Sequence, residues 1–313
     1  MFLLKLFLRA IGALSERGVL IAALILAGTA VAGIQIVEAV LFGRVVNALV
    51  EAEPATRVLL TWAVLGALGI LINVVLALAA DRLAHRNKLK VLVSAFEGAL
   101  RRPRPVGGED GSGAVIRTIL VGADAFFAAW LSFFRELVPA LTALVILFPI
   151  AVLMSPALTA TLLVLTVLYL AANLFILTRT QSGQREVDAH TRYLASRIGD
   201  VMTNASVVHA FTRLAKETEA LKVMTRDVLE RQYPVLNWWA VLNVFTRASA
   251  TISVVSVFIV GAFLVGRGEL SIGTVVSFAG FAALLIARLE QAAGAITRLF
   301  PVAPVMENLL SML

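Results

Sequence analysis

Six ionisable side chains stand within long apolar stretches of this 313-residue chain. A charged group inside a hydrocarbon layer is costly, so it usually faces a partner or a water-filled cavity and becomes a candidate for binding a polar solute. Glu38 fits the role of a structural hydrogen-bond anchor equally well. The six residues are Glu38, Arg135, Glu136, Arg247, Arg288 and Glu290.

Aromatic side chains stand next to two of these charges. Phe127, Trp130 and Phe134 follow one another at i, i+3 and i+7, which places them on one stripe of a helix. Arg135 and Glu136 come directly after this stripe. Aromatic faces pack against the C–H surfaces of sugars, and charged or amide groups bind sugar hydroxyls, so the combination suits a hydroxyl-rich solute.

A second aromatic group precedes another of the charges. Tyr233, Trp238 and Trp239 are followed at four-residue spacing by Asn243 and Arg247. We predict that both groups line the inward-facing mouth of a wide polar cavity. An alternative is that the tryptophans and the tyrosine form an interfacial belt at the ends of membrane spans. The arginines of both groups could likewise extend to the membrane surface without any part in transport.

The composition indicates the elements that hold these residues. The chain is 60% apolar and its mean hydropathy is +0.92, which is typical of a polytopic membrane protein and not of a soluble domain. It has no cysteine, so disulfides and thiolate metal sites are excluded, and its three histidines lack metal-ligand spacing. The net charge of +7 indicates basic loops beside a membrane and not a nucleic-acid partner.

Six apolar runs are each long enough to cross a hydrocarbon core of about 30 Å. Short and long connections alternate between them, and apolar residues recur at helical spacing through the second long connection, Thr178 to Trp239. The fold predicted is therefore an all-α membrane protein of six transmembrane helices with two long cytoplasmic helical hairpins. The predicted spans are Val19–Phe42, Val58–Ala80, Phe127–Leu153, Pro156–Leu177, Ala240–Val265 and Ile272–Leu289.

The distribution of basic residues predicts the orientation. The N-terminal tail and the two long connections together hold 20 Lys and Arg, whereas the three short connections hold 3. Because basic loops stay on the cytoplasmic side, both termini and both hairpins are predicted to be cytoplasmic. Basic and apolar residues alternate through residues 1–18, which predicts a helix lying in the membrane interface and not a signal peptide.

Each half of the first long connection matches its neighbouring span in length. The stretch from Val58 to about Leu100, and the one from about Gly111 to Leu153, would each form a helix about 65 Å long, about twice the hydrocarbon core. Prolines and glycines between Arg101 and Gly113 prevent a helix from continuing through the first tip. The second tip has no such breaker.

This layout resembles the transmembrane domain of ABC exporters. The resemblance covers essentially the whole chain and is strongest in several short stretches. Within that family, the chain is most similar to bacterial exporters of cyclic β-1,2-glucan through Glu38–Arg44, Ala80–His85 and Tyr233–Ala240. The stretches similar to the wider family are Leu100–Pro103, Ala205–Phe211 with Lys216 and Glu217, Gly268–Gly273 and Met306–Leu310.

The resemblance implies a function and partners. It implies an exporter that moves a polar glucan from the cytoplasm to the periplasm by alternating access, as a homodimer of twelve spans in the bacterial inner membrane. Residues 19–301 would form the six-span domain, and 302–313 the start of a linker to a nucleotide-binding domain. The hairpin tips would couple to that ATPase domain through Arg102, Pro103, Arg104, Pro105, Phe211, Thr212, Arg213, Lys216 and Glu217.

The chain departs from the family in one respect. It contains no Gly-x-x-x-x-Gly-Lys-Ser/Thr phosphate loop, so it binds no cofactor of its own, and ATP and Mg²⁺ would be held by an ATPase domain in trans or in a longer chain. Whether the chain counts as an enzyme therefore stays open. Solvated basic loops are the alternative reading of the tips. Two other functions remain: export of a lipid-linked or hydrophobic substrate, and a non-transporting truncated or regulatory membrane partner.

Overall fold

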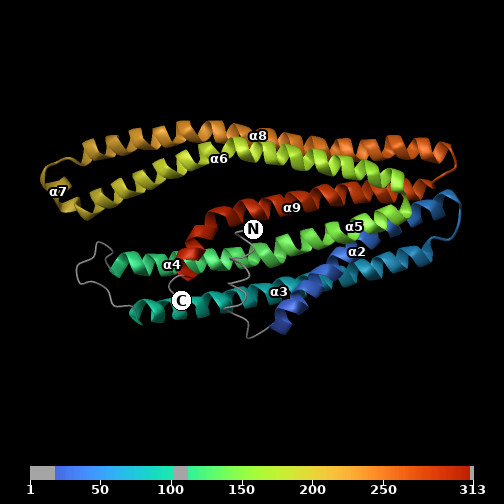
Figure 1. The fold of residues 1–313 in the computed structure, drawn as a ribbon, viewed down its shortest axis with the longest axis horizontal. Coiled ribbons are helices and arrows are strands. Elements are labelled where there is room, and N and C mark those ends of the chain that lie inside the picture. Colours follow the sequence, from blue (N-terminus) through green and yellow to red (C-terminus); the bar gives the residue numbers. More distant parts are fainter. Residues whose placement is uncertain (1–17, 102–111, 311–313) are drawn as a thin grey trace. The chain divides into compact units, whose positions relative to one another are not determined.

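The structure is a computed structural model that describes residues 18–101 and 112–310 (Figure 1). Within these ranges the chain forms helices joined by short turns and contains no strand. Six of the helical stretches are long and apolar enough to cross a membrane, which confirms the predicted all-α fold with six spans. The predicted coupling residues Arg102–Pro105 lie outside the described residues, as does all of the predicted interfacial helix except Gly18.

Helix α2 (Gly18–Val50) is longer than the first predicted span. The predicted span ends at Phe42, but the helix continues eight residues further, through Gly43 to Val50. The turn comes instead at Glu51–Ala55, where Pro54 interrupts the chain before α3 (Thr56–Arg101) begins. Helix α3 has 46 residues, or about 69 Å at 1.5 Å per residue, which confirms a single rod through the second span and half of the first hairpin.

The returning half of that hairpin and the third span form one continuous rod. It consists of α4 (Ser112–Leu131), the π-helical turn η2 (Ser132–Leu137) and α5 (Val138–Met154). Ser155 is extended and caps the next helix, α6 (Pro156–Thr203), by accepting a hydrogen bond from the Leu158 N–H. Pro156 occupies the first helical position, where its missing N–H costs nothing.

The second hairpin consists of α6, α7 (Ala205–Ala210) and α8 (Leu214–Gly266). A tight turn at residues 267–271, with Gly268 at φ +72°, leads to α9 (Ile272–Leu310). The chain divides into two compact units, each described by itself below. Unit 1 comprises Met1–Leu162 and Ser253–Leu313, and unit 2 comprises Leu163–Ile252.

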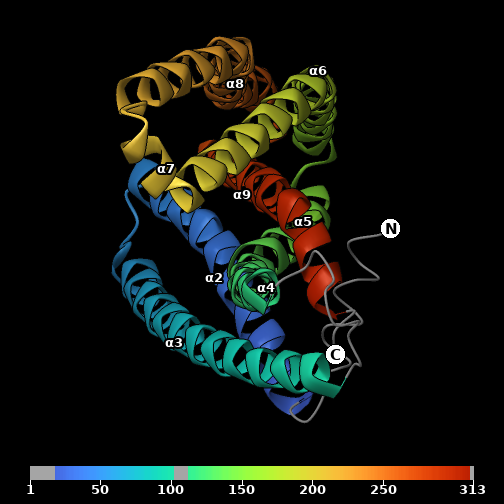
Figure 2. The same ribbon diagram turned by 90° about the vertical axis from the view of Figure 1, so that its left-hand side faces the viewer.

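Helix α9 is the central helix of unit 1. It packs against α2, α4 and α5, while α3 packs against α2 and α4 (Figure 2). The most apolar part of α9 is far more buried than that of α3. Large apolar side chains of α3 are therefore left exposed to lipid or to a partner. The core runs along the inner faces of α3, α4 and α9 and includes Leu76, Val91, Phe126, Trp130 and Met306.

The first and last spans of unit 1 approach most closely at two glycines. A Cβ on Gly43 of α2 would lie 2.1 Å from the Gly273 carbonyl oxygen of α9, and a Cβ on Gly273 would lie 2.0 Å from that of Gly43. One turn further along α2, Asn47 Oδ1 accepts a hydrogen bond from the Gly273 N–H (2.6 Å), and its Nδ2 donates to Ser271 Oγ (2.9 Å). Only backbone without side chains allows this crossing.

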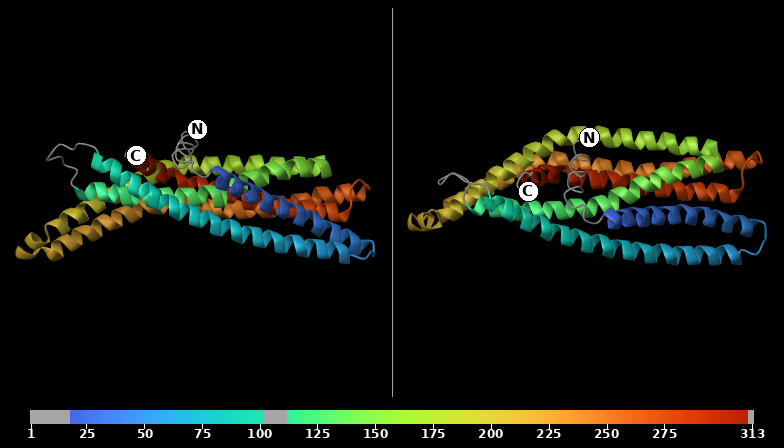
Figure 3. Two further views of the ribbon diagram at one scale, coloured as in Figure 1. Left: turned by 90° about the horizontal axis from the view of Figure 1, so that it is seen from below. Right: turned by 60° about the horizontal axis from the view of Figure 1, so that its bottom comes forward.

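In unit 2, α6 runs toward α7 and α8 returns from it in the opposite direction (Figures 1 and 3). They approach closely at Gly183, where an added Cβ would lie 2.9 Å from Val235 Cγ2. Val235 is buried and follows Pro234 within α8. On one side of this point Phe175 and Trp238 meet edge to face, with ring centroids 6.3 Å apart, and on the other side ion pairs join the two helices.

Candidate functional site

The tip of unit 2 is an exposed short helix. Helix α6 ends at Thr203, α7 occupies Ala205–Ala210, and three residues lead into α8. Thr212 has φ +54°, a left-handed conformation that a threonine rarely adopts, so the turn is sharp. The Phe211 ring is 70% exposed, which places a large apolar group where a partner could cover it.

The predicted coupling residues of this hairpin all lie at or beside the tip. Phe211, Thr212 and Arg213 form the turn, and Lys216 is exposed in the first turn of α8. Glu217 differs from the others because it pairs with Arg197 of α6, with Arg197 Nη2 2.5 Å from Glu217 Oε2. That pair ties the end of α6 to the start of α8, so Glu217 supports the tip and does not present its charge outward.

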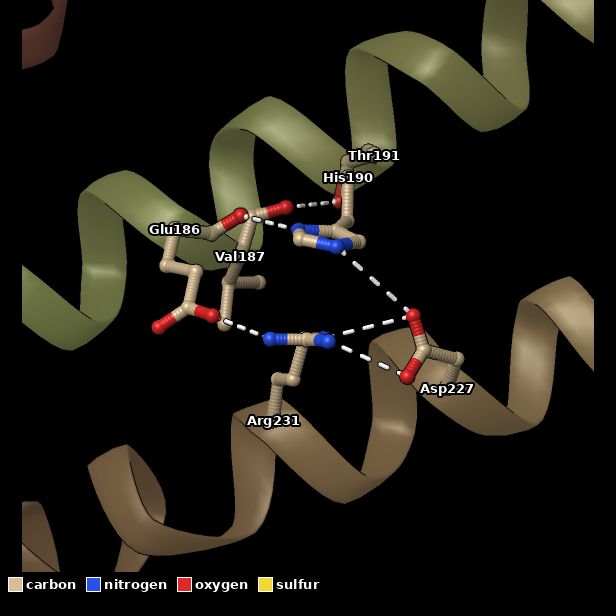
Figure 4. A network of polar contacts seen from close by, with 6 residues as sticks. All are labelled: Glu186, Val187, His190, Thr191, Asp227 and Arg231. Atoms are coloured by element: carbon tan, nitrogen blue, oxygen red, sulfur yellow. Dashed lines mark hydrogen bonds and ion pairs between the residues drawn. The ribbon is translucent and has the colours of Figure 1, made fainter.

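A polar network joins α6 and α8 further along the hairpin (Figure 4). Arg231 Nε donates to both carboxylate oxygens of Asp227 (3.2 and 3.3 Å), and its Nη1 pairs with Glu186 of α6. His190 of α6 contacts the Glu186 carbonyl oxygen through Nδ1 (2.9 Å) and lies 3.7 Å from Asp227 through Nε2. Each helix supplies a carboxylate and a basic group, so polar contacts join the two helices at this level.

The second predicted aromatic group also belongs to unit 2. Tyr233, Trp238 and Trp239 are each more than a third exposed, so their rings are available to a solute or to lipid. Arg247 is exposed, and its Nε donates to Asn243 Oδ1 at 3.2 Å, one helical turn earlier. The structure thus joins these two predicted residues and gives Arg247 a neutral partner.

The first predicted group belongs to unit 1, and its members separate in the structure. Trp130 and Phe134 are 1% and 3% exposed and pack in the core, with ring centroids 4.8 Å apart. Both rings are covered by core neighbours in this conformation, and the prediction that they line a cavity stays a prediction. Phe127 is half-buried and packs against His85 of α3, with ring centroids 4.5 Å apart and the ring planes tilted by 42°.

Polar pairs follow the boundary between α3 and α4. Lys88 of α3 pairs with Asp124 of α4, and its ammonium group also lies 5.8 Å from the Phe127 ring centroid. About two turns along α3 and three turns along the opposite rod, Asp81 accepts a hydrogen bond from Arg135 Nη1 at 2.9 Å. The side chains of both pairs are partly exposed, so a row of charges with an aromatic face between them runs toward the spans.

Arg135 and Glu136 lie in the π-helical turn η2, and Pro139 explains why the turn forms. In an α-helix the Arg135 carbonyl would accept from the N–H of residue 139, but proline has none and its ring clashes with that carbonyl. The helix widens instead, as seen where the Val138 N–H bonds to the Phe133 carbonyl five residues back. The released Arg135 carbonyl accepts a hydrogen bond from Gln291 Nε2 of α9 at 3.4 Å.

The same turn sends neighbouring charges toward different helices. Arg135 reaches Asp81 of α3, whereas Glu136 pairs with Arg298 of α9. A third basic residue, Arg288 of α9, donates to the side-chain oxygens of Gln35 and Gln291. This cluster joins α2, α3, η2 and α9 through polar side chains in the apolar part of unit 1.

The remaining candidates within the spans of unit 1 are Glu38 of α2 and Glu290 of α9, and Glu290 is exposed. The Glu38 side chain is half-buried and lies against the backbone of α3, because a Cβ on Gly66 would be 3.1 Å from Glu38 Oε1. Of the two predicted pathway groups, the one around Arg135 belongs to unit 1 and the one around Arg247 belongs to unit 2. Among the described residues, no group of three or more His, Asp or Glu could hold a metal ion.

The comparison with family models decides the class of protein. Residues 21–289 match the model of the ABC transporter transmembrane region. The chain belongs to this family. The match covers all six spans and both hairpins, and the long helices and the short tip helix α7 are thus features of an ABC transmembrane region.

Several curated bacterial proteins are similar over nearly the whole of this ABC transmembrane region. A β-(1→2)glucan export ATP-binding/permease protein of Mesorhizobium japonicum is 36% identical over 291 residues, which is 93% of this chain and 49% of that protein. Those of Rhizobium meliloti and Agrobacterium vitis are 34% and 35% identical over 308 residues, or 98% of this chain and 53% of each relative. The chain spans about half the length of these relatives.

Several polar residues of the ABC transmembrane region escaped the sequence reasoning. Asp81, His85 and Lys88 recur at i, i+4 and i+7, a spacing that places them on one helical face and could have indicated a shared partner. Pro139, four residues after Arg135, was the available signal for the π-helical turn. Gln35, Asp124, Gln291 and Arg298 are single polar residues inside long helices, and no spacing in the sequence indicated their partners on other helices.

Proposed function

We propose that this chain is the transmembrane part of an ATP-driven exporter that moves a β-(1→2)glucan out of the cytoplasm. The observation that carries the proposal is the similarity to glucan export permeases over 93 to 98% of the chain. Charged and amide groups within the spans support it, because they suit a polar cargo better than an apolar one.

ATP and Mg²⁺ would be bound by an ATPase domain outside these 313 residues. The printed names of the relatives include ATP binding, and the relatives are about twice as long as this chain. The exposed tip of unit 2, with Phe211 and Lys216, would seat on that domain. The orientation follows from the basic residues, with the tips and both termini in the cytoplasm of a bacterial cell and the spans in its inner membrane.

The paired helices of unit 2 would transmit force. Domain closure moves packed elements as rigid bodies only if they cannot slide past each other. The Arg197–Glu217 pair near the tip and the Arg231 network along the helices resist such sliding. Closure of the ATPases on ATP binding would tilt α6 and α8 together and switch the cavity from inward to outward access.

A homodimer would complete the pathway. Six helices leave little room for a large polar oligosaccharide, whereas twelve related by a two-fold axis can enclose one. Much of the surface of α3 remains exposed, and its large apolar side chains there include Leu60, Ile70 and Val75. The transport pathway would use Phe127, Arg135 and Glu136 from unit 1 and Tyr233, Trp238, Trp239, Asn243 and Arg247 from unit 2.

Purification from native membranes with the associated ATPase, followed by reconstitution into liposomes, tests the proposal. We expect cyclic β-(1→2)glucan to stimulate ATP hydrolysis, and ATP to drive labelled glucan into vesicles whose ATPases face outward. Stimulation by a lipid and not by glucan would replace the cargo with a hydrophobic one. Failure to recover any ATPase with the chain would support a non-transporting partner.

A further inference from the structure

Gln35 of α2 and Gln291 of α9 are brought together by one arginine in the apolar part of unit 1. Arg288 Nη2 donates to Gln35 Oε1, and Arg288 Nη1 donates to Gln291 Oε1. All three side chains are half-buried. A glutamine pair held by a cation within membrane spans is costly to bury, which favours a role in binding over one in packing.

The charges around this cluster are balanced except at Arg288. Arg135 pairs with Asp81, and Arg298 pairs with Glu136. In the part of the chain that the structure describes, the partners of Arg288 are the two amide oxygens, and its Nε is buried without a hydrogen-bond partner. Arg288 therefore acts on the two amides and not on a carboxylate.

The arginine fixes which way each amide points. A guanidinium group only donates hydrogen bonds, so each glutamine must turn its oxygen toward Arg288 and its NH₂ group away. The Gln291 NH₂ group makes one long contact with the Arg135 carbonyl, at 3.4 Å. The Gln35 NH₂ group makes no hydrogen bond within the described ranges, 18–101 and 112–310. Amide donors are thus left over on both α2 and α9.

The leftover groups define the ligand chemistry. One N–H of each terminal nitrogen of Arg288 goes to a glutamine oxygen and its Nε is buried, so the donors left over on the two amides are the Gln35 and Gln291 NH₂ groups. Amide N–H groups beside a backbone carbonyl oxygen suit a neutral group that both accepts and donates, and an alcohol hydroxyl does this. We propose that Gln35 and Gln291, oriented by Arg288, form a hydroxyl-binding subsite for one sugar ring of the transported glucan; this rests on the proposed function.

Glutamine-to-glutamate substitutions separate binding from structure. In Gln35→Glu and Gln291→Glu, a carboxylate oxygen of nearly the same shape still accepts from Arg288, while the N–H donors are lost. We expect each variant to keep the melting temperature of the parent protein. The glucan concentration for half-maximal stimulation of ATPase activity should rise about three- to tenfold, as expected for the loss of one or two hydrogen bonds. Isothermal titration of glucan in the absence of nucleotide should give the same ratio.

Gln181→Glu is the matched control. Gln181 is exposed on α6 in unit 2 and has Arg185 four residues further on, so a carboxylate there meets no like charge at that spacing and should change neither measurement. An unchanged glucan concentration in both subsite variants, with a parent protein that glucan stimulates, overturns the subsite alone. A parent protein that glucan neither stimulates nor binds overturns the proposed function and the subsite with it.

Discussion

At the scale of single residues, two glycines determine how closely α2 and α9 of unit 1 pack. Gly43 and Gly273 let the backbones of α2 and α9 touch, and Asn47 then bonds to the α9 backbone and to Ser271. Any side chain at either glycine must push the helices apart. Gly33, also on α2, has no atom within 4 Å of the position its Cβ would occupy, so the two sites differ only in their neighbours.

We predict that Gly43→Ala destabilises the protein by about 1–3 kcal/mol, because the added methyl group overpacks the crossing. Gly33→Ala should leave stability unchanged or raise it slightly, since alanine is the better helix former. Thermal unfolding in detergent measures both. Equal melting temperatures for the two variants would show that the helices separate without cost at Gly43.

The Arg197–Glu217 pair supports a second prediction at this scale. Arg197→Glu places two carboxylates together beside the tip and should lower glucan-stimulated ATP hydrolysis by about threefold, an effect of the size expected for a partly exposed ion pair. The double variant Arg197→Glu with Glu217→Arg restores opposite charges and should recover the activity. No recovery would mean that the two side chains act separately, each on the ATPase domain.

At the scale of elements, the π-helical turn η2 is the feature that sets the direction of polar side chains. Because Pro139 withholds an N–H, the Arg135 carbonyl is released to Gln291, and Arg135 and Glu136 reach different helices. An uninterrupted α-helix would satisfy that carbonyl internally. The proline therefore turns a structural helix into a polar junction among α3, η2 and α9.

Replacing Pro139 with alanine tests this view. The restored N–H should bond to the Arg135 carbonyl, convert the turn to α-helix and release Gln291. We expect a stability equal to or above that of the parent, with glucan-stimulated ATP hydrolysis reduced about fivefold by the loss of the junction. Pro149→Ala, in the α5 part of the same rod, is the control and should leave that activity unaltered. If the two proline variants behave alike, the turn has no part in transport.

The elements themselves were largely predictable from the sequence. Hydropathy located all six spans, and the matched lengths of the two halves of the first hairpin predicted that α3 would continue beyond the membrane to about Leu100. The stripe of Phe127, Trp130 and Phe134 could not be assigned from the sequence, because apolar rings at helical spacing look the same in a core and in a cavity wall. The turn η2 also breaks that spacing just after Trp130. Partners from distant helices, such as Gln291, depend on tertiary packing and have no local signal.

At the scale of the whole molecule, the orientation across the membrane can be measured directly. The chain has no cysteine, so a single introduced cysteine is the only thiol. We predict that Ser206→Cys, on exposed α7, reacts with an impermeant maleimide only after the cells are opened, whereas Glu53→Cys, in the turn between α2 and α3, reacts in spheroplasts. The reverse labelling pattern would place the tip of unit 2 outside the cytoplasm and would contradict the proposed direction of transport.

The crossing of α2 and α9 also has a consequence for biosynthesis. Asn47 and Ser271 are 224 positions apart, so a ribosome must deliver nearly the entire chain to the insertion machinery before this contact exists. Until then, α2 lies in the bilayer without the α9 backbone that packs against Gly43. Nascent chains stalled before α9 should therefore be degraded by membrane proteases. The chain should become resistant once α9 has inserted and packed against α2.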